Sequence, residues 1–241
     1  MIYSFLQNGD TAVTVQFKNE ISKEVNSCVT ELARLIEQKK IKGVVELVPA
    51  FASLTVFYDC TVISSDKLRK KLASLIKKVS VSKAVKARVY KIPVCYDDEF
   101  APDMDNVCSH TGLSRQEVIE LHTSKPYLIY MLGFLPGFAY LGGMDERLFT
   151  PRLETPRLEI FEGAVGIGGE QTGIYPIASP GGWQLIGRTP VKVYDKSKAD
   201  PILYRAGDYI QFYGITADEF KKIENEVKNG SYQPSFEEAV L

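Results

Sequence analysis

Hydrophobic residues in the first 91 positions follow two different periods. Val13, Val15 and Phe17 recur at every second position, which predicts a half-buried strand. After Ser22, the expected N-cap, hydrophobic residues recur at helical spacing. Gly43 is expected to stop this helix. The pattern predicts six elements, in the order strand, helix, strand, strand, helix, strand: residues 11–18, 22–40, 44–48, 53–58, 65–79 and 88–94. This β-α-β-β-α-β order predicts a small split βαβ, ferredoxin-like domain over residues 1–91.

A helical connector is predicted at residues 103–123, at the start of a second domain that spans 92–241. A short helix at 103–110 and a turn at 111–113 precede Ser114, which opens an S-x-x-E capping box with Glu117. A helix-turn-helix for DNA is disfavoured, because Arg115 is the only base at the second helix's start and Glu117 and Glu120 accompany it. The connector is therefore predicted to be an ordinary helical hairpin.

Glycine and proline divide the chain into short apolar stretches after Pro126. Twelve of the 18 glycines lie between Gly133 and Gly187, and helical periodicity is absent there. Strands are predicted at residues 127–132, 164–167, 185–186, 191–194 and 209–212, followed by a helix at 216–228. Such a pattern favours a closed or sandwich-like β structure, so the whole chain is predicted to be α+β.

Composition and charge narrow the class of protein. The 241 residues are 45% hydrophobic and 24% charged, which is typical of a globular protein, and no apolar run is long enough to span a membrane. Residues 1–91 carry 16 Lys and Arg against 8 Asp and Glu, whereas 92–241 carry 13 against 22. The basic half is explained by the polar faces of two helices, so nucleic acid is not an expected partner. Four well-separated cysteines and the lack of a secretory leader predict a cytoplasmic protein without a metal site.

Two segments of the sequence resemble catalytic motifs, but each lacks an essential part of its motif. Residues 182–189 resemble a phosphate-binding loop, but Arg188 replaces the lysine and a strand, not a helix, is predicted to follow. Residues 177–181 resemble a nucleophile elbow around Ser179, but Pro180 removes the backbone donor that an oxyanion hole needs. His122 is the only plausible base for such a serine. The chain is therefore not expected to be a complete enzyme by itself.

Candidate binding residues concentrate in the lysine-free segment between Lys125 and Lys192. Its neutral and cationic groups suit a polar small molecule with a carboxylate or phosphate: Gln171, Thr172, Tyr175, Ser179 and Arg188. A PRLE repeat places Arg152 and Arg157 five residues apart, on opposite faces if the segment is one extended strand. Each could face a pocket or a partner, or pair with surface glutamates. The aromatics Phe134, Phe138, Tyr140 and Trp183 form either core or an adhesive groove.

One long stretch carries a resemblance to a known family. Residues 131–190, MLGFLPGFAYLGGMDERLFTPRLETPRLEIFEGAVGIGGEQTGIYPIASPGGWQLIGRTP, strongly resemble the KipI / allophanate-hydrolase-subunit-1 family, whose members are also called the 5-oxoprolinase B subunit, and the match spans about 125–212. The resemblance implies an α/β N-terminal domain and a cyclophilin-like β-barrel. The sequence departs from the family's usual Val-Pro-Ala-Gly-Ser-Val, because Phe161 stands for the proline and Ala164 for the serine.

The family implies both an activity and partners. Together with the A and C subunits of the enzyme, the latter of the allophanate-hydrolase-subunit-2 type, such a chain opens 5-oxoproline to glutamate at the expense of ATP. The site hypothesis assigns substrate or phosphate binding to the five polar residues above, with Arg152, Arg157 and His122 assisting or lining the subunit junction. Phe134, Phe138, Tyr140 and Trp183 are assigned to partner binding. The alternative, implied by a founding member, is an inhibitor of a sporulation histidine autokinase.

Overall fold

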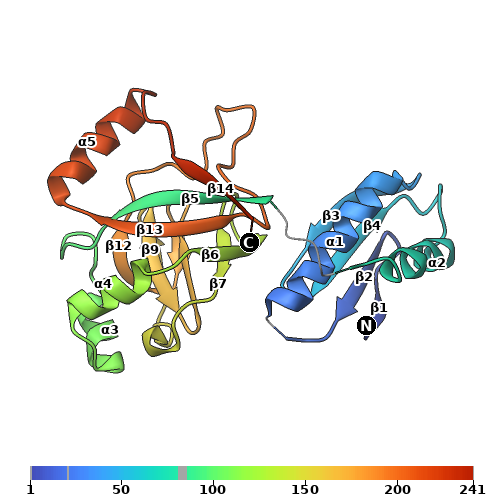
Figure 1. The fold of residues 1–241 in the computed structure, drawn as a ribbon, viewed down its shortest axis with the longest axis horizontal. Helices are drawn as coiled ribbons and strands as arrows, with labels where there is room; N and C mark the ends of the chain where they lie inside the picture. The colour runs from blue at the N-terminus through green and yellow to red at the C-terminus, as the bar shows by residue number, and fades with distance from the viewer. Residues whose placement is uncertain (1, 21, 81–85, 241) are drawn as a thin grey trace. The chain divides into compact units, whose positions relative to one another are not determined.

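The computed structural model describes residues 2–20, 22–80 and 86–240. The chain divides into two compact units, Met1–Ala84 and Val85–Leu241, each with its own hydrophobic core (Figure 1).

The first unit is a four-stranded antiparallel sheet with two helices on one face. The strand order is β1-β2-β4-β3, and α1 connects β2 to β3 while β4 lies between them. Side chains from both helices and from the strands form one core. The elements are β1 (Tyr3–Asn8), β2 (Ala12–Phe17), α1 (Lys23–Lys39), β3 (Val44–Pro49), β4 (Ser53–Tyr58) and α2 (Ser65–Ile76).

Local sequence explains the first helix well. The Ser22 side chain accepts a hydrogen bond from the backbone N–H of Val25 at 3.2 Å, as expected of an N-cap. Leu32 and Ile36 are buried on the face predicted from the periodicity. The helix ends at Lys39, and its C-cap Lys40 adopts a left-handed conformation with φ 47°, so the helix stops before Gly43. The second helix ends at Ile76, three residues before its predicted end.

The predicted ferredoxin-like order is not confirmed, because the strand expected at 88–94 belongs to the other unit. That strand, β5 (Lys86–Cys95), runs parallel to β13 and antiparallel to β12 and β14. The fourth strand of the first sheet is instead β1, which the periodicity missed and which pairs with β2 along its whole length. The unit thus has the order β-β-α-β-β-α.

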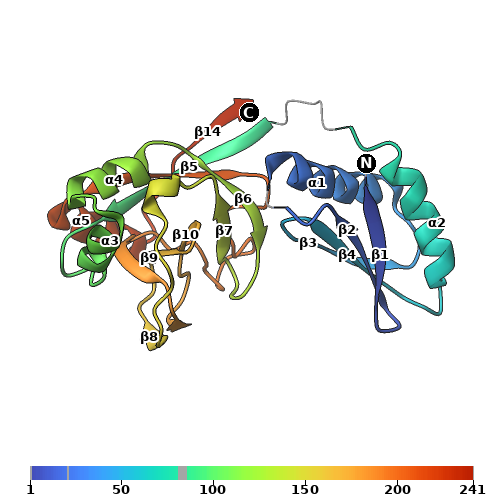
Figure 2. The same cartoon turned by 90° about the horizontal axis from the view of Figure 1, so that it is seen from below.

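The second unit is built on an eight-stranded, nearly closed sheet (Figures 1 and 2). The strand path is β10-β9-β12-β5-β13-β6-β7, with β14 also on β5, and the two ends of the path, β10 and β7, lie close together. β8 and β11 form a separate two-stranded ribbon. The further strands are β6 (Tyr127–Leu132), β7 (Ala139–Gly142), β8 (Arg157–Ile160), β9 (Ala164–Gly168), β10 (Gln171–Ile174), β11 (Ser179–Gly181), β12 (Gln184–Arg188), β13 (Tyr209–Ile215) and β14 (Phe236–Val240).

Helices cover parts of this sheet, as expected from the sequence. The connector forms α3 (Met104–Thr111) and α4 (Arg115–Thr123), and the predicted capping box between Ser114 and Glu117 is present in both directions. A short turn η1 (Glu146–Leu148) and the C-terminal α5 (Ala217–Lys228) complete the unit. The strand predicted at 191–194 is wrong, because only Tyr194 forms a single bridge there, to Ile202. Within the described ranges, no helix has the length and apolar character to cross a bilayer.

Candidate functional site

His122 lies at the centre of a buried chain of hydrogen bonds that sequence reasoning did not foresee. Its Nδ1 is 2.8 Å from the hydroxyl of Tyr96, and its Nε2 is 2.8 Å from the hydroxyl of Thr172. The Thr172 hydroxyl donates its one hydrogen to the carbonyl oxygen of Gly166 at 3.0 Å. His122 Nε2–H must therefore donate to Thr172, and Tyr96 donates to Nδ1.

This arrangement keeps the imidazole neutral. His122 is fully buried, its ring is stacked on Phe212 at 4.6 Å, and burial lowers its pKa to about 3. Both ring nitrogens are occupied, and Thr172 is fully buried as well. The structure therefore places these two predicted site residues in the barrel core, where they hold α4 against β10 and do not face solvent.

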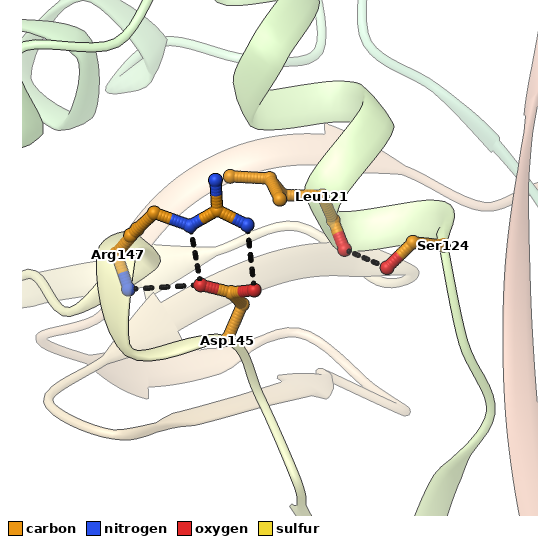
Figure 3. A network of polar contacts seen from close by, with 4 residues as sticks. All are labelled: Leu121, Ser124, Asp145 and Arg147. Carbon is orange, nitrogen blue, oxygen red and sulfur yellow. Dashed lines mark hydrogen bonds and ion pairs between the residues drawn. The ribbon is translucent and has the colours of Figure 1, made fainter.

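The four arginines of the lysine-free segment have four different environments. Arg147 is engaged within its own turn, where its Nε and Nη2 donate to the two carboxylate oxygens of Asp145 at 2.9 and 3.0 Å (Figure 3). The hydrogen bonds from this guanidinium and from the Arg147 backbone lower the pKa of Asp145 to about 2. The adjoining end of α4 is closed by Ser124, whose hydroxyl donates to the carbonyl of Leu121. Arg147 is thus a local structural residue.

Arg188 lies among aromatic rings at the end of β12. Its guanidinium carbon is 5.3 Å from the ring centre of Phe161, 5.5 Å from that of Phe220 and 5.9 Å from that of Phe100. Its Nε donates to the carbonyl oxygen of Glu162 at 3.0 Å. Phe161, which replaces the proline expected by the resemblance, thus supplies one of the rings. These cation–π contacts join α5 to the barrel and give Arg188 a structural role.

Arg157 is held by a buried carboxylate. Its Nη2 donates to Oδ1 of Asp103 at 2.6 Å, while Oδ2 of Asp103 accepts from the backbone N–H of Leu185 at 2.6 Å. The Asp103 side chain is 3% exposed and that of Arg157 is 31% exposed. Asp103 precedes α3, but its carboxylate makes these distant contacts and does not cap the helix. The sequence analysis placed Asp103 only as the first residue of a short helix at 103–110, so this role was missed.

Arg152 and Arg157 converge on one tyrosine. The guanidinium of Arg152 lies 5.9 Å from the ring centre of Trp183. Burial raises the pKa of Tyr175, and the positive charges of Arg152 and Arg157 both act on it in the opposite direction. The prediction that the two arginines lie on opposite faces of one strand is wrong, because Arg152 precedes β8 and the chain bends at residues 154–155 between them.

The aromatic residues beside these arginines form mostly core. Phe138 is 2% exposed and contacts the rings of Tyr140, Tyr175 and Trp183 at centroid distances of 5.1, 5.4 and 5.4 Å. Although proline and glycine interrupt this segment, β7 begins directly after Phe138 and joins the barrel sheet. Only Phe134 is largely exposed, at 64%, and Tyr140 is half-buried.

Several buried polar atoms at this site have no partner among the described residues. They are Nη1 of Arg157, Oγ of Ser179 and Oε1 of Gln184. Gln184 was not singled out from the sequence, and its Nε2 donates to the carbonyl of Pro151 at 3.0 Å. Gln171, by contrast, is only half-buried at the start of β10. Unpaired buried donors and acceptors are costly, so this region has unused capacity for a polar ligand.

No metal centre is found in the part of the chain that the structure describes, since no group of three or more His, Cys, Asp or Glu there could hold an ion. The candidate binding site consists of Arg152, Arg157, Tyr175 and Trp183.

The comparisons with known proteins define first the class of domain. The sequence profile "Carboxyltransferase domain, subdomain C and D" matches residues 3–204. The fold is that of a domain in Kluyveromyces lactis urea carboxylase, with a TM-score of 0.84 at 24% identity, over 99% of this chain and 24% of that one. At such low identity this likeness shows the fold alone.

Curated relatives then identify the family. The chain is 42% identical to the 5-oxoprolinase B subunit of Bacillus subtilis, over 93% of this chain and 98% of that protein. It is 39% identical to the 5-oxoprolinase B subunit of Escherichia coli O157:H7, over 85% of this chain and 92% of that protein. The chain belongs to the B-subunit family of 5-oxoprolinase, within the carboxyltransferase domain class. It also matches the solved protein TTHA0988 at 35% identity with a TM-score of 0.75, and it spans 40% of that chain's length.

Proposed function

We propose that this protein is the B subunit of an ATP-dependent 5-oxoprolinase, which opens 5-oxoproline to glutamate together with the A and C subunits of the same enzyme. The observation that carries the proposal is the 42% identity to a protein named as this subunit, which extends over nearly the full length of both chains. The reaction adds water across the ring amide bond, and the complex couples it to hydrolysis of ATP. The cyclophilin-like class of the barrel and a cytoplasmic location belong to the same proposal.

Dependence on partner subunits is supported by the chain's own chemistry. His122, the one candidate base, is buried and neutral with both nitrogens bonded. Ser179 is buried in the β8–β11 ribbon. Domains of the same fold also occur within longer chains, because this chain spans only 40% of TTHA0988 and 24% of the urea carboxylase chain. These facts support a chain that works beside other domains. Inhibition of a histidine kinase stays a prediction.

We expect the purified chain alone to form no glutamate from 5-oxoproline and ATP, since its candidate base, His122, and its candidate nucleophile, Ser179, are both buried. Co-expression with the cognate A and C subunits should restore ATP-dependent glutamate formation, measured by a coupled glutamate assay. Leaving out any one subunit is the matched control. Turnover by the single chain would contradict its dependence on partners, and an inactive but assembled complex would contradict the proposed reaction.

We infer that Phe134 contacts the C subunit. It is 64% exposed, its ring lies edge-on to Phe138 at 5.5 Å, and its backbone φ of 61° is in the left-handed region that non-glycine residues rarely adopt. An exposed aromatic held in a strained conformation is typical of a binding surface. Phe138 and Trp183 would support this contact from below, since they are buried.

Phe134→Ala is therefore expected to cause a loss of about tenfold in affinity for the C subunit, which corresponds to roughly 1.4 kcal/mol. The stability of the isolated chain should stay almost unchanged, because little of the ring is buried. Titration calorimetry with the purified C subunit measures the first effect, and chemical denaturation measures the second. Phe236→Ala, which truncates another partly exposed phenylalanine on β14, is the control. Equal affinities for Phe134→Ala and the unmodified chain would remove Phe134 from the interface.

A further inference from the structure

Two buried hydrogen-bond donors on the β8–β11 ribbon have no partner among the residues that the structure describes. They are Nη1 of Arg157, on β8, and the hydroxyl of Ser179, on β11. The ribbon pairs Arg157 with Gly181 and Ser179 with Ile160. Ser179 is 7% exposed, so its hydroxyl is shielded from solvent. Both atoms can donate a hydrogen bond, and neither has an acceptor among the described residues.

The Arg157 guanidinium is not free to turn toward another acceptor. Asp103 binds its Nη2, and the second oxygen of the same carboxylate is fixed by the backbone N–H of Leu185 in β12. The backbone N–H of Asp103 in turn donates to the carbonyl of Leu185 at 3.0 Å. A buried carboxylate anchored in this way holds one N–H group of the guanidinium in place and restrains the rest of it.

The surroundings favour an anion at this place. A Cβ on Gly181 would lie 2.5 Å from the hydroxyl oxygen of Tyr175, which places the phenol against the ribbon strand that pairs with Arg157. Arg152, whose guanidinium lies over Trp183, adds a second positive charge near the same phenol. The two arginines outnumber the one carboxylate, Asp103, that contacts them. A planar carboxylate accepts two parallel hydrogen bonds from such donors.

We propose that Arg157 and Ser179 bind the carboxylate group of the substrate, that Arg152 is the second cation of this site, and that Asp103 is the positioning residue that orients Arg157. The inference rests on the proposed function, because 5-oxoproline carries a carboxylate beside its ring amide. The buried rings of Trp183 and Tyr175 stand edge-on to each other at 6.2 Å, and Trp183 lies beneath the guanidinium of Arg152.

Trp183 makes the site directly observable, because it is the only tryptophan in the sequence. Adding 5-oxoproline to the full chain, and to the assembled complex, should change its fluorescence in a saturable manner as Arg152 shifts over the indole. The ligand 2-pyrrolidinone, which has the same ring amide without the carboxylate, should cause no saturable change over the same concentrations. A change of equal affinity with 2-pyrrolidinone would overturn the proposal.

Variants separate binding from positioning. Arg157→Gln should raise the dissociation constant for 5-oxoproline at least about tenfold, and Arg157→Lys should recover part of the loss because it keeps the charge. Asp103→Asn should raise the dissociation constant similarly and, in the complex, raise the KM for 5-oxoproline without changing the KM for ATP. Arg147→Gln is the matched control, since Arg147 is bound to Asp145 within its own turn. Circular dichroism checks that each variant is folded.

The outcomes distinguish this inference from the proposed function. If the unmodified chain and complex show no response to 5-oxoproline, or if Arg157→Gln leaves both the dissociation constant and the KM unchanged while the complex turns over, the carboxylate site is wrong and the 5-oxoprolinase stands. If Arg157→Gln weakens only the association with the C subunit, the guanidinium binds a partner and the inference is likewise overturned. If the fluorescence response follows the expected pattern but the complete complex forms no glutamate, the site stands and the proposed reaction falls.

Discussion

Replacing Phe138 by alanine should lower the free energy of unfolding of the second unit by about 3–5 kcal/mol, the range typical of a buried phenylalanine. Phe138 is 2% exposed and its ring contacts four other aromatic rings, those of Phe134, Tyr140, Tyr175 and Trp183. Removing it would leave a cavity beneath Trp183, and neighbouring strands could fill that cavity only in part. Denaturation followed by Trp183 fluorescence reports on this unit, because the sequence has no other tryptophan.

Phe134→Ala is the control for this experiment, because it removes a similar ring from the same segment where it is mostly exposed. We expect that variant to change the unfolding free energy by less than about 1 kcal/mol. Similar losses for both variants would contradict the distinction between a buried and an exposed phenylalanine. A loss below about 1 kcal/mol for Phe138→Ala would show that the cluster is loosely packed.

Acidification should destabilise the second unit through His122. The unfolded imidazole titrates near pH 6.5, whereas burial lowers the pKa of His122 in the folded protein to about 3. Between these two values, the unfolded state binds a proton that the folded state does not bind. The effect is absent above pH 6.5 and grows by about 1.4 kcal/mol for each pH unit below it, down to the folded pKa. At pH 4 His122 alone should therefore cost about 3 kcal/mol.

The variant His122→Gln isolates this effect, because glutamine cannot be protonated in this range and its amide can still donate toward Thr172. Whatever its stability at pH 7, the slope of unfolding free energy against pH between 6.5 and 4 should be shallower in the variant by about 1.4 kcal/mol per pH unit. In the folded protein, the imidazole proton signals of His122 should not titrate down to pH 4, with the exposed His110 recorded alongside. Equal slopes, or a His122 midpoint near pH 6, would show that the hydrogen-bond chain opens to solvent.

Residues of the candidate site contact partners that lie far away along the chain, and such contacts are hard to predict from the sequence. The cluster of Arg152, Arg157, Tyr175 and Trp183 comes from the same lysine-free segment for which the sequence predicted a polar ligand. The partner that orients Arg157 lies 54 residues away, at Asp103. His122 was chosen as a base because it stood alone in the sequence, yet Tyr96 and Thr172, 26 and 50 residues away, occupy both of its nitrogens. Residue type suggested these candidates, but burial decided what they do.

The sequence by itself determined the elements whose cause is local. The helix at 23–39, the strand at 53–58 and the capping box of Ser114 follow from periodicity and from side chains within a few residues, since each is stabilised by near neighbours along the chain. The motif-rich stretch 131–190 also indicated the family, which the relatives confirm.

Only the tertiary structure decided which sheet each strand joins and which polar groups meet. The strand at 86–95 has the same hydrophobic pattern whether it closes the first sheet or lies within the barrel, because the pattern records burial and not the identity of the neighbours. The strand β5 pairs with β13, which lies more than a hundred residues further along the chain. The Asp103–Arg157 contact is formed only when α3 and the ribbon come together. Such contacts depend on chain closure over long separations, and no local preference specifies them.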